Sequence, residues 1–338
     1  MKREPKKSWT ADSLLELGRS YQAAAVFAAA ADLDLFDVLA GGSLPGRELA
    51  RRLCCNLRGL VVLLDALVAL RLLTKRARRY SLPAGAATFL TSDGSRSILA
   101  MAQHQANCLR RWTQLARVVK TGRSGKRMPS VRGKTGDAAA FIGAMHNVSA
   151  PVADQVIRAM QPLQCHHLLD IGGASGTWTI AFLRACPAAR ATLFDLPHVI
   201  PMARRRLAAE GLDRRVKLVA GDFMADALPR GADLAWVSAI VHQNSRAQNR
   251  RLFANVFQAL VPGGRISIRD VLMEESRIEP VAGALFAVNM LVATEGGGTF
   301  TFEELRKDLE TASFVEAAVL RRDEGMNSIA VARKPSRP

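Results

Sequence analysis

The sequence predicts an α/β protein, in which a doubly wound, mainly parallel sheet is preceded by a mainly helical domain of winged-helix type. Two observations support this fold class. From residue 167 onward short apolar strands alternate with helical stretches, an order that gives parallel strands covered by helices on both faces. Before that point helical patterns dominate. With 338 residues, 49% of them hydrophobic, the chain is long enough for two domains with cores of their own.

The first domain is expected over residues 8–100. A turn at Ala40–Gly46 precedes two helices within 45–73, and "LLTKRARRYSL" then indicates a small β-wing, which completes a winged-helix outline. The second helix, residues 57–70 ("LRGLVVLLDALVAL"), is apolar on nearly every face, whereas a DNA-reading helix must show polar side chains to the groove. We therefore expect this helix to be buried, in a domain that serves dimerisation or packing.

Residues 101–160 are expected to form connecting helices and a basic linker. The stretch Thr121–Gly136 is rich in Gly, Ser, Lys and Arg and has no apolar period, which is typical of a linker or mobile loop. A further helix is predicted from Asp137, and Pro151 marks a break or a new helix start inside it.

Residues 161–338 are predicted to form the α/β domain. Two of its helices carry capping boxes, in which a Ser or Thr cap is followed three residues later by Gln or Glu. One begins at Ser245 and ends at Gly263, and the other begins at Thr301. The last strand is expected to run antiparallel. Strands are predicted at residues 167–171, 189–196, 216–223, 232–241, 265–273, 315–320 and 328–334.

Composition limits the classes of function. The most apolar stretch, Leu57–Leu73, is interrupted by charges and falls short of the ~18 apolar residues that a membrane span requires. The basic start is not followed directly by an apolar signal segment, so a cytoplasmic protein is expected. The five cysteines form no C-x-x-C pair, which favours reduced, mostly buried thiols over a disulfide framework or a structural zinc site.

The net charge of +17 raises the question of a nucleic-acid partner. Basic residues are spread through the whole chain, and no aromatic residues interleave with their local clusters as they do on a base-stacking platform. A solvated basic surface is therefore favoured over a nucleic-acid site.

The stretch 168–178, "LLDIGGASGTW", joins an apolar strand, a carboxylate and three glycines. In a doubly wound sheet the first strand–helix turn approaches the ligand closely. This turn departs from the G-x-G-x-x-G pattern of dinucleotide sites, and Asp170 at its mouth would repel a pyrophosphate. Acids also follow the next two strands, at Asp195 and at Asp222, which precedes Phe223. Taken alone, each acid is equally well explained as a helix cap or as a solvated turn residue.

Three acids at successive strand ends suit a ligand that carries positive charge. S-adenosylmethionine has a sulfonium, an ammonium, a ribose and an adenine. Asp170 is then expected toward the amino-acid end, Asp195 on the ribose hydroxyls, and Asp222 beside the adenine. The predicted cofactor-binding residues are Asp170, Gly172, Gly173, Gly176, Asp195, Leu196, Asp222, Phe223 and Ser238.

At these motifs the chain resembles the S-adenosylmethionine-dependent small-molecule O-methyltransferases of the caffeic acid, acetylserotonin and hydroxyneurosporene type. The resemblance covers nearly the whole chain. It implies a class I methyltransferase sheet, a homodimer, and an aromatic, quinone or polyketide-like hydroxylated acceptor, with no metal. The motifs that carry it are "LLDIGGASG", "FDLP" (Phe194–Pro197), "GDF" (Gly221–Phe223), "VHQNS" (Val241–Ser245), "LVPGGRISIRD" (Leu260–Asp270) and "EGGGTFTFEEL" (Glu295–Leu305).

In that family a histidine just after the fourth strand removes the proton of the acceptor, and His242 occupies that place. A phenol of pKa ~10 attacks a methyl group far better as it loses its proton, and a histidine of pKa ~6.5 can take that proton. Carboxylates orient the histidine of the family. Asp270 matches one of them, and Thr299 stands where the second is expected, with Glu295 as an alternative. The His-Asp-Trp motif of the family is His-Gln-Asn here.

Candidates for the acceptor pocket lie in three segments that combine apolar and hydrogen-bonding side chains. His146 and Asn147 are favoured, because adjacent polar groups inside an apolar helix need partners. Met145 and Met290 are as well explained by a place in the core. The full set is His104, Asn107, Trp112, Met145, His146, Asn147, Asn289 and Met290.

Other functions stay open at this point. The basic charge allows a nucleic-acid methyltransferase, whose affinity would fall steeply with salt. The substitution at Thr299 and the altered His-Gln-Asn motif allow a cofactor-binding scaffold or regulator that has lost catalysis. A nicotinamide-dependent dehydrogenase is disfavoured by the acid at the glycine turn.

Overall fold

The computed structural model describes residues 8–336, and the chain divides into two compact units. The N-terminal unit comprises Met1–Arg110 and Met128–Ala144, and the C-terminal unit comprises Arg111–Arg127 and Met145–Pro338. Residues 101–160, expected to connect two domains, are thus shared between the two units.

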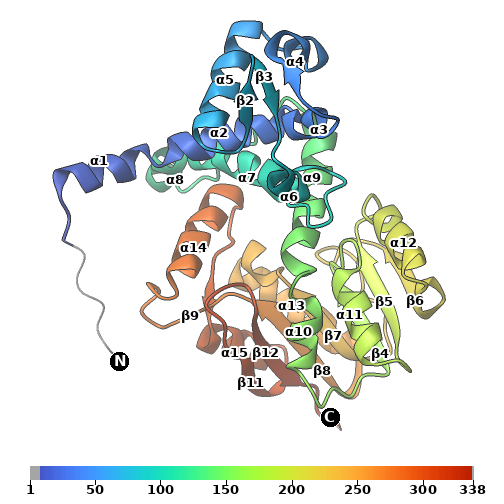
Figure 1. Ribbon diagram of the computed structural model, residues 1–338. Helices are drawn as coiled ribbons and strands as arrows, with labels where there is room; N and C mark the ends of the chain where they lie inside the picture. The colour runs from blue at the N-terminus through green and yellow to red at the C-terminus, as the bar shows by residue number, and fades with distance from the viewer. Residues whose placement is uncertain (1–7, 337–338) are drawn as a thin grey trace. The chain divides into compact units, whose positions relative to one another are not determined.

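The N-terminal unit is mainly helical and contains one small sheet (Figure 1). In this sheet β3 pairs antiparallel with β1 and with β2, so that the predicted wing follows the helix pair α4 and α5. Its elements are α1 (Ala11–Arg19), α2 (Tyr21–Asp32), α3 (Leu35–Ala40), β1 (Leu44–Pro45), α4 (Gly46–Arg52), α5 (Leu57–Ala69), β2 (Thr74–Arg76), β3 (Arg79–Ser81), α6 (Ala84–Leu90), most of α7 (Leu99–Trp112) and most of α9 (Gly133–Ser149).

Helix α5 is less buried than its sequence predicts. Leu60, Leu64 and Leu67 lie on one face, at helical spacing, and pack into the core. On another face Val62 is 65% exposed and Leu57 is also exposed. The expectation of a helix buried all round is therefore wrong for the single chain, and an apolar face of this helix is left uncovered.

The C-terminal unit is built on a seven-stranded sheet of order β11-β12-β8-β7-β4-β5-β6. The five strands from β4 to β8 pair in parallel, and β12 runs antiparallel to both of its neighbours, as predicted for the last strand. Its strands are β4 (His167–Ile171), β5 (Arg190–Asp195), β6 (Val216–Ala220), β7 (Ala232–Ser238), β8 (Leu260–Asp270), β11 (Val315–Arg321) and β12 (Ser328–Arg333), and a separate parallel pair is formed by β9 (Leu272–Met273) and β10 (Phe300–Thr301).

Helices cover both faces of the large sheet (Figure 1). Because side chains alternate along a strand, Leu168 and Trp236 face one helical layer, and Leu169 and Val237 face the other. The first layer contains α10 (Ala153–Arg158), α11 (Thr177–Ala185) and α12 (Ile200–Ala209), and the second contains α13 (Arg246–Ala259) and α15 (Phe302–Thr311). The remaining elements are α8 (Leu115–Thr121), α14 (Val281–Ala293) and the 3-10 helices η1 (Asp213–Arg215) and η2 (Val241–Gln243).

Both predicted capping boxes are present, at Ser245 and Thr301. The helix that begins after Ser245 ends at Ala259 instead of Gly263, because β8 already begins at Leu260. The predicted break at Pro151 is confirmed, since it lies between the end of α9 and the start of α10.

The basic stretch predicted as a linker is partly fixed to the C-terminal unit. The Gln114 side chain donates to the Lys126 carbonyl and accepts from its N–H, both at 2.9 Å. The N–H of Gly125 donates to the carbonyl of Val292 on α14, also at 2.9 Å. This part of the chain therefore forms an ordered strap along α14.

None of the five cysteines forms a disulfide, but only Cys165 is buried and Cys54 is exposed, so the expectation of mostly buried thiols is wrong. Within residues 8–336 no helix combines the length and apolar character needed to cross a membrane. The same residues contain no group of three or more His, Cys, Asp or Glu side chains able to hold a metal ion.

Candidate active site

The glycine turn joins the end of β4 to the start of α11. Gly172 and Gly176 have φ values of +66° and +83°, which favour glycine. Gly173 is needed for close packing, because a Cβ atom there would lie 2.6 Å from Cγ of Leu193. The turn thus leaves bare backbone at the carboxyl end of the central strand, where a ligand can approach.

Asp170 is buried beneath this turn. Its carboxylate accepts a 2.5 Å hydrogen bond from the hydroxyl of Thr179 on α11. Burial raises the pKa of Asp170 to about 7, against the lowering effect of the Thr179 bond, and the nearby Asp195 adds to the rise. Sequence reasoning missed Thr179, although a fully buried threonine inside the apolar helix "TWTIAFL" is a signal of a polar partner.

Asp195 ends β5 and faces the same turn. Its carboxylate accepts from the N–H groups of Ala174 and Leu196, both at 2.7 Å. Burial raises the pKa of Asp195, and the two backbone hydrogen bonds oppose the rise. The bond from Ala174 ties the carboxylate directly to the glycine turn.

Asp222 and Phe223 follow β6 in a loop rather than inside the strand, which ends at Ala220. The Asp222 carboxylate accepts from the N–H of Met224 at 2.9 Å, and Phe223 is half-buried against the core. The loop is joined to the neighbouring strand by a 2.9 Å hydrogen bond from the N–H of Gly221 to the carbonyl of Asp195. The three predicted acids therefore lie at or just after the carboxyl ends of three adjacent strands.

His242 lies in η2, directly after β7, and is 7% exposed. Its Nδ1 lies 2.9 Å from both carboxylate oxygens of Asp270, the last residue of β8. Because a carboxylate only accepts, Nδ1 carries the proton and Nε2 presents its lone pair. Within residues 8–336 nothing hydrogen-bonds Nε2, and Asp270 is the only carboxylate bonded to this ring.

The surroundings of His242 hold the imidazole in place. The ring of Phe286 on α14 meets it edge-on, with 4.8 Å between centroids. The carbonyl of His242 accepts a 2.9 Å hydrogen bond from the N–H of Gly298, and a Cβ atom on the neighbouring Gly297 would collide with that carbonyl. Sequence reasoning missed Phe286, because nothing in the local pattern of α14 points to a histidine more than forty residues earlier.

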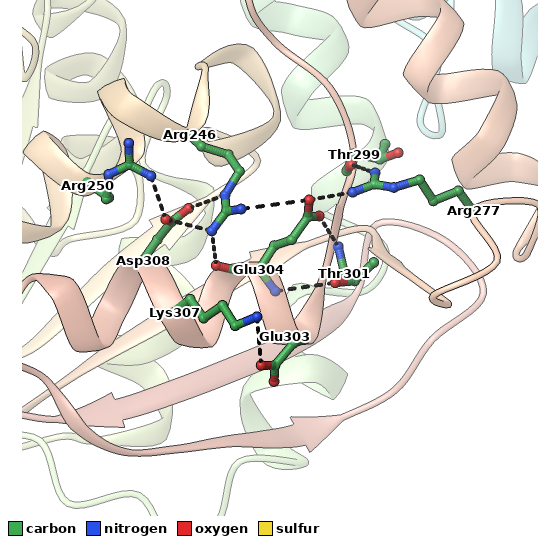
Figure 2. A network of polar contacts seen from close by, with 9 residues as sticks. All are labelled: Arg246, Arg250, Arg277, Thr299, Thr301, Glu303, Glu304, Lys307 and Asp308. Carbon is green, nitrogen blue, oxygen red and sulfur yellow. Dashed lines mark hydrogen bonds and ion pairs between the residues drawn. The ribbon is translucent and has the colours of Figure 1, made fainter.

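The predicted second orienting group, Thr299, is buried next to β10 but forms no hydrogen bond with His242 within residues 8–336. Its carbonyl accepts from Arg277 at 3.1 Å, and Arg277 also pairs with Glu304 (Figure 2). Glu304 in turn accepts from the N–H of Thr301 at 3.0 Å. Thr299 is thus fixed by its backbone, and a catalytic role for it stays a prediction. The alternative, Glu295, is exposed.

A second group of charged side chains links helices α13 and α15. The buried carboxylate of Asp308 on α15 accepts from Arg246 at 2.8 and 2.9 Å and from Arg250 at 3.0 Å (Figure 2). Both arginines lie on α13, which begins four residues after His242. A fully paired buried carboxylate of this kind stabilises the position of α13 and α15.

Comparison with known proteins adds the decisive observation. Residues 112–314 match the model of the O-methyltransferase domain, and residues 15–92 match the model of the O-methyltransferase dimerisation domain. The chain belongs to the O-methyltransferase family. It is an enzyme that uses S-adenosylmethionine, and its fold is that of the class I methyltransferases.

Two bacterial relatives align over most of this methyltransferase. The tetracenomycin polyketide synthesis 8-O-methyl transferase TcmO of Streptomyces glaucescens is 31% identical over 330 residues, which cover 95% of this chain and 96% of the relative. The 3-hydroxy-5-methyl-1-naphthoate 3-O-methyltransferase of Streptomyces sahachiroi is 32% identical over 298 residues (87% and 86%). A crystal structure of human N-acetylserotonin methyltransferase in complex with SAM matches with a TM-score of 0.80 at 25% identity, and covers 98% of this chain and 100% of that one.

The residues at the glycine turn of this methyltransferase fit its cofactor. The acids at the strand ends supply negative charge for a ligand with sulfonium and ammonium groups, and the turn lacks the arrangement of a pyrophosphate site. The glycine backbone leaves room that a Cβ on Gly172 or Gly173 would fill.

The predicted acceptor residues fall into three groups. Trp112 and Asn289 come together, because the indole N–H donates to Oδ1 of Asn289 at 2.9 Å. Met290, on the same helix as Asn289, is buried in the core. His104 and Asn107 belong to the N-terminal unit. For all of these residues, contact with an acceptor stays a prediction.

The third group lies on the last turns of α9. His146 accepts at Nδ1 from Arg206 on α12, and this nitrogen also lies 3.1 Å from the hydroxyl of Thr177. Burial, with Arg206 as a second cause, lowers the pKa of His146 to about 4. Its neighbours Met145 and Asn147 are half-buried. The Nδ1 of His146 therefore already has polar partners on α12 and at the start of α11, both in the first helical layer.

Proposed function

We propose that this enzyme methylates a hydroxyl of a phenolic, polyketide-like acceptor and that His242 is the general base. The observation that carries the proposal is the buried pair of His242 and Asp270, whose geometry leaves Nε2 as the acceptor of a proton. The nature of the acceptor is supported by the two bacterial relatives, whose names specify a polyketide and a hydroxynaphthoate.

The residues around His242 have different roles in the proton transfer. Asp270 accepts from Nδ1–H, fixes the tautomer and stabilises the imidazolium that forms when Nε2 takes the proton of the acceptor hydroxyl. Phe286 limits rotation of the ring and, with the backbone of Gly298, keeps it in place. S-adenosylmethionine, when bound, supplies a methyl group on a positively charged sulfur. A hydroxyl that loses its proton to His242 attacks such a carbon far better than a neutral hydroxyl does.

The cofactor is assigned to the carboxyl ends of β4, β5 and β6. Asp170 and the glycine turn would hold the amino-acid end, Asp195 the ribose hydroxyls, and Asp222 with Phe223 the adenine. The support is the burial and pairing of these acids, since Asp195 is oriented by Ala174 and Asp170 by Thr179. Leu196, which is exposed and whose N–H donates to the Asp195 carboxylate, would border the ribose.

The functional test separates binding from proton transfer. We expect His242→Gln to lower kcat for methylation of a hydroxynaphthoate by roughly 10²- to 10⁴-fold, the range of general-base catalysis, and to leave the Kd for S-adenosylhomocysteine unchanged. His166→Gln is the matched control, because Nδ1 of His166 also lies 2.9 Å from a carboxylate oxygen, that of Asp233, but the imidazole is exposed. Equal activity of the two variants would refute the role of His242. Cofactor binding without transfer to any hydroxylated aromatic in the wild type would instead favour the scaffold alternative.

We also infer that the enzyme is a homodimer. The dimerisation-domain match spans residues 15–92. In this segment and just before it, large apolar side chains are exposed in the single chain, namely Trp9, Leu14, Leu15, Leu17, Tyr21, Leu57, Val62 and Leu70. Apolar surface of this kind is typical of an obligate interface. Light scattering should give about 73 kDa, twice the 36.6 kDa of one chain.

A further inference from the structure

Helix α14 lies on an excursion of the chain that begins and ends at one pair of strands. The strand before the helix, β9, and the strand after it, β10, pair in parallel. The helix carries Phe286, whose ring meets the imidazole of His242 edge-on. The two segments that flank α14, residues 274–280 and 294–299, are therefore both connected to the same strand pair.

Arg277, in the first of these segments, joins it to the second. Its Nη1 donates to the carbonyl of Thr299 at 3.1 Å, and its Nη2 donates to Oε1 of Glu304 (Figure 2). Glu304 is itself fixed, because its Oε2 accepts from the N–H of Thr301 at 3.0 Å and its own N–H donates to the Thr301 hydroxyl at 3.2 Å. The guanidinium thus connects the turn before α14 to the segment after it and to the cap of α15.

The turn around Arg277 is ordered by its own hydrogen bonds. The N–H of Arg277 donates to the carbonyl of Glu274, and the N–H of Glu274 donates to the carbonyl of Glu279, both at 2.9 Å. Arg277 has a φ of +60°, in the left-handed region that residues with a side chain rarely adopt. Such a conformation persists where surrounding contacts determine it, and the bonds of this turn and of the guanidinium supply such contacts.

The segment that Arg277 holds lies against the backbone of His242. Gly298 donates its N–H to the carbonyl of His242 at 2.9 Å. Gly297 lies so close that a Cβ atom there would be 2.4 Å from the same carbonyl oxygen. Thr299, the next residue, has the carbonyl that accepts from Arg277. Two contacts with His242 and one with Arg277 therefore fall on three consecutive residues.

This segment needs contacts from outside to stay ordered. Residues 296–298 are three consecutive glycines, which lose more conformational freedom on ordering than any other residue and have no side chain to fix them. Near its start the run is held by the hydroxyl of Thr294, which accepts from the N–H of Gly297 at 2.9 Å. At its end it is held by the pairing of β10 and by Arg277.

We propose that Arg277 is a positioning residue for His242. By binding the carbonyl of Thr299 and the carboxylate of Glu304, it keeps the glycine segment against the backbone of His242. Asp270 fixes the orientation of the imidazole, and Arg277 fixes the place of the residue that carries it, so that Nε2 stays within reach of the acceptor hydroxyl. This inference rests on the assignment of His242 as general base made under the proposed function.

The first measurement is the kinetics of Arg277→Met. With a hydroxynaphthoate as acceptor, kcat should fall roughly 10- to 100-fold, since a misplacement of about 1 Å can cost 10²-fold. The KM for the acceptor and the Kd for S-adenosylhomocysteine should each change less than about twofold. Arg322→Met is the matched control and should retain wild-type kcat. Arg322 pairs with Glu274 of the same turn, and the side chains of both arginines are 50% exposed.

The second measurement repeats the substitution in the His242→Gln enzyme. The base that Arg277 positions is absent there, so Arg277→Met should lower kcat by less than about twofold. A role in the stability of the fold alone would lower kcat by the same factor in both backgrounds. If Arg277→Met does not fold, Glu304→Gln takes its place, because glutamine keeps the capping contact with Thr301 and removes the charge that binds Arg277.

Two results would overturn the proposal. One is an unchanged kcat in Arg277→Met, whether or not the KM for the acceptor changes, and the other is an equal loss of kcat in both backgrounds. Failure of the proposed function would appear differently, as a wild-type kcat in His242→Gln itself.

Discussion

Two histidines of the C-terminal unit, the buried His242 and the half-buried His146, differ in the charge of their partners. His242 faces the carboxylate of Asp270, and His146 faces the guanidinium of Arg206. In the first pair Nδ1 donates and Nε2 is left to accept a proton. In the second pair Nδ1 accepts from a cation, which lowers the pKa of the ring further than burial alone. Burial by itself therefore does not make a histidine a base, and the sign of the neighbouring charge decides its chemistry.

Removal of the Asp270 carboxylate should have the largest effect on methyl transfer, because it changes the charge beside His242. Asp270→Asn is expected to lower kcat about 10²-fold, because an amide can also donate and no longer stabilises the imidazolium. The Kd for S-adenosylhomocysteine should not change. Asp233→Asn, in the exposed pair with His166, is the control and should retain wild-type kcat. A normal kcat for Asp270→Asn would remove Asp270 from the account.

Asp170, the buried carboxyl beneath the glycine turn, provides a second test, because its charge depends on pH and on the bound cofactor. Asp170 has a pKa of about 7, raised from 3.8, so its own contribution to folding stability is fully present below pH 3.8 and is lost as the pH rises through 7. A bound cation favours the carboxylate, so S-adenosylmethionine should release up to one proton at pH 6, and its affinity should fall up to about tenfold per pH unit below 7. Titration in two buffers of different ionisation heat measures the proton count. Asp170→Asn should abolish the release, and an unchanged count would contradict the assignment.

A smaller effect is expected at His146. Arg206→Met should raise the pKa of this histidine above 4, but not to 6.5, because burial is the larger cause of the shift. Proton NMR of the imidazole measures the change, with the exposed neighbour Arg205→Met as the control. An unchanged pKa in Arg206→Met would show that the guanidinium has no part in the shift.

The same histidine affects acid stability. Its pKa is 6.5 when unfolded and about 4 when folded, so acid favours the unfolded chain, which binds the proton first. Between these two values His146 should lower the free energy of unfolding by at most about 1.4 kcal/mol per pH unit. The difference between wild type and Arg206→Met in denaturant titrations should therefore depend on pH in this window and be constant above it.

Local patterns predicted the parts of the site that depend on strand order. The acids Asp170, Asp195 and Asp222 follow apolar strands, and the topology of a parallel sheet brings such strand ends to one edge. His242 and Asp270 were located by resemblance to a family, and the geometry pairs them. In these cases the information lies within a few residues of the motif.

The features that the sequence did not predict depend on distant partners. His146 is separated from Arg206 by 60 residues, and Arg269 from Asn327 by 58, so neither pairing has a local signal. The exposed face of α5 was missed for a related reason, since apolar periodicity shows that a face needs cover but not whether the cover comes from the same chain.

The dependence of methyl transfer on pH tests the role of His242 most directly. In the wild type, kcat/KM for a hydroxynaphthoate acceptor should level off at a pH below the pKa of about 10 of a free phenol, because the enzyme itself takes the proton of the acceptor. In His242→Gln only acceptor that is already ionised can react, so kcat/KM should rise about tenfold per pH unit up to the pKa of the acceptor. Profiles of the same shape in both enzymes would contradict the account.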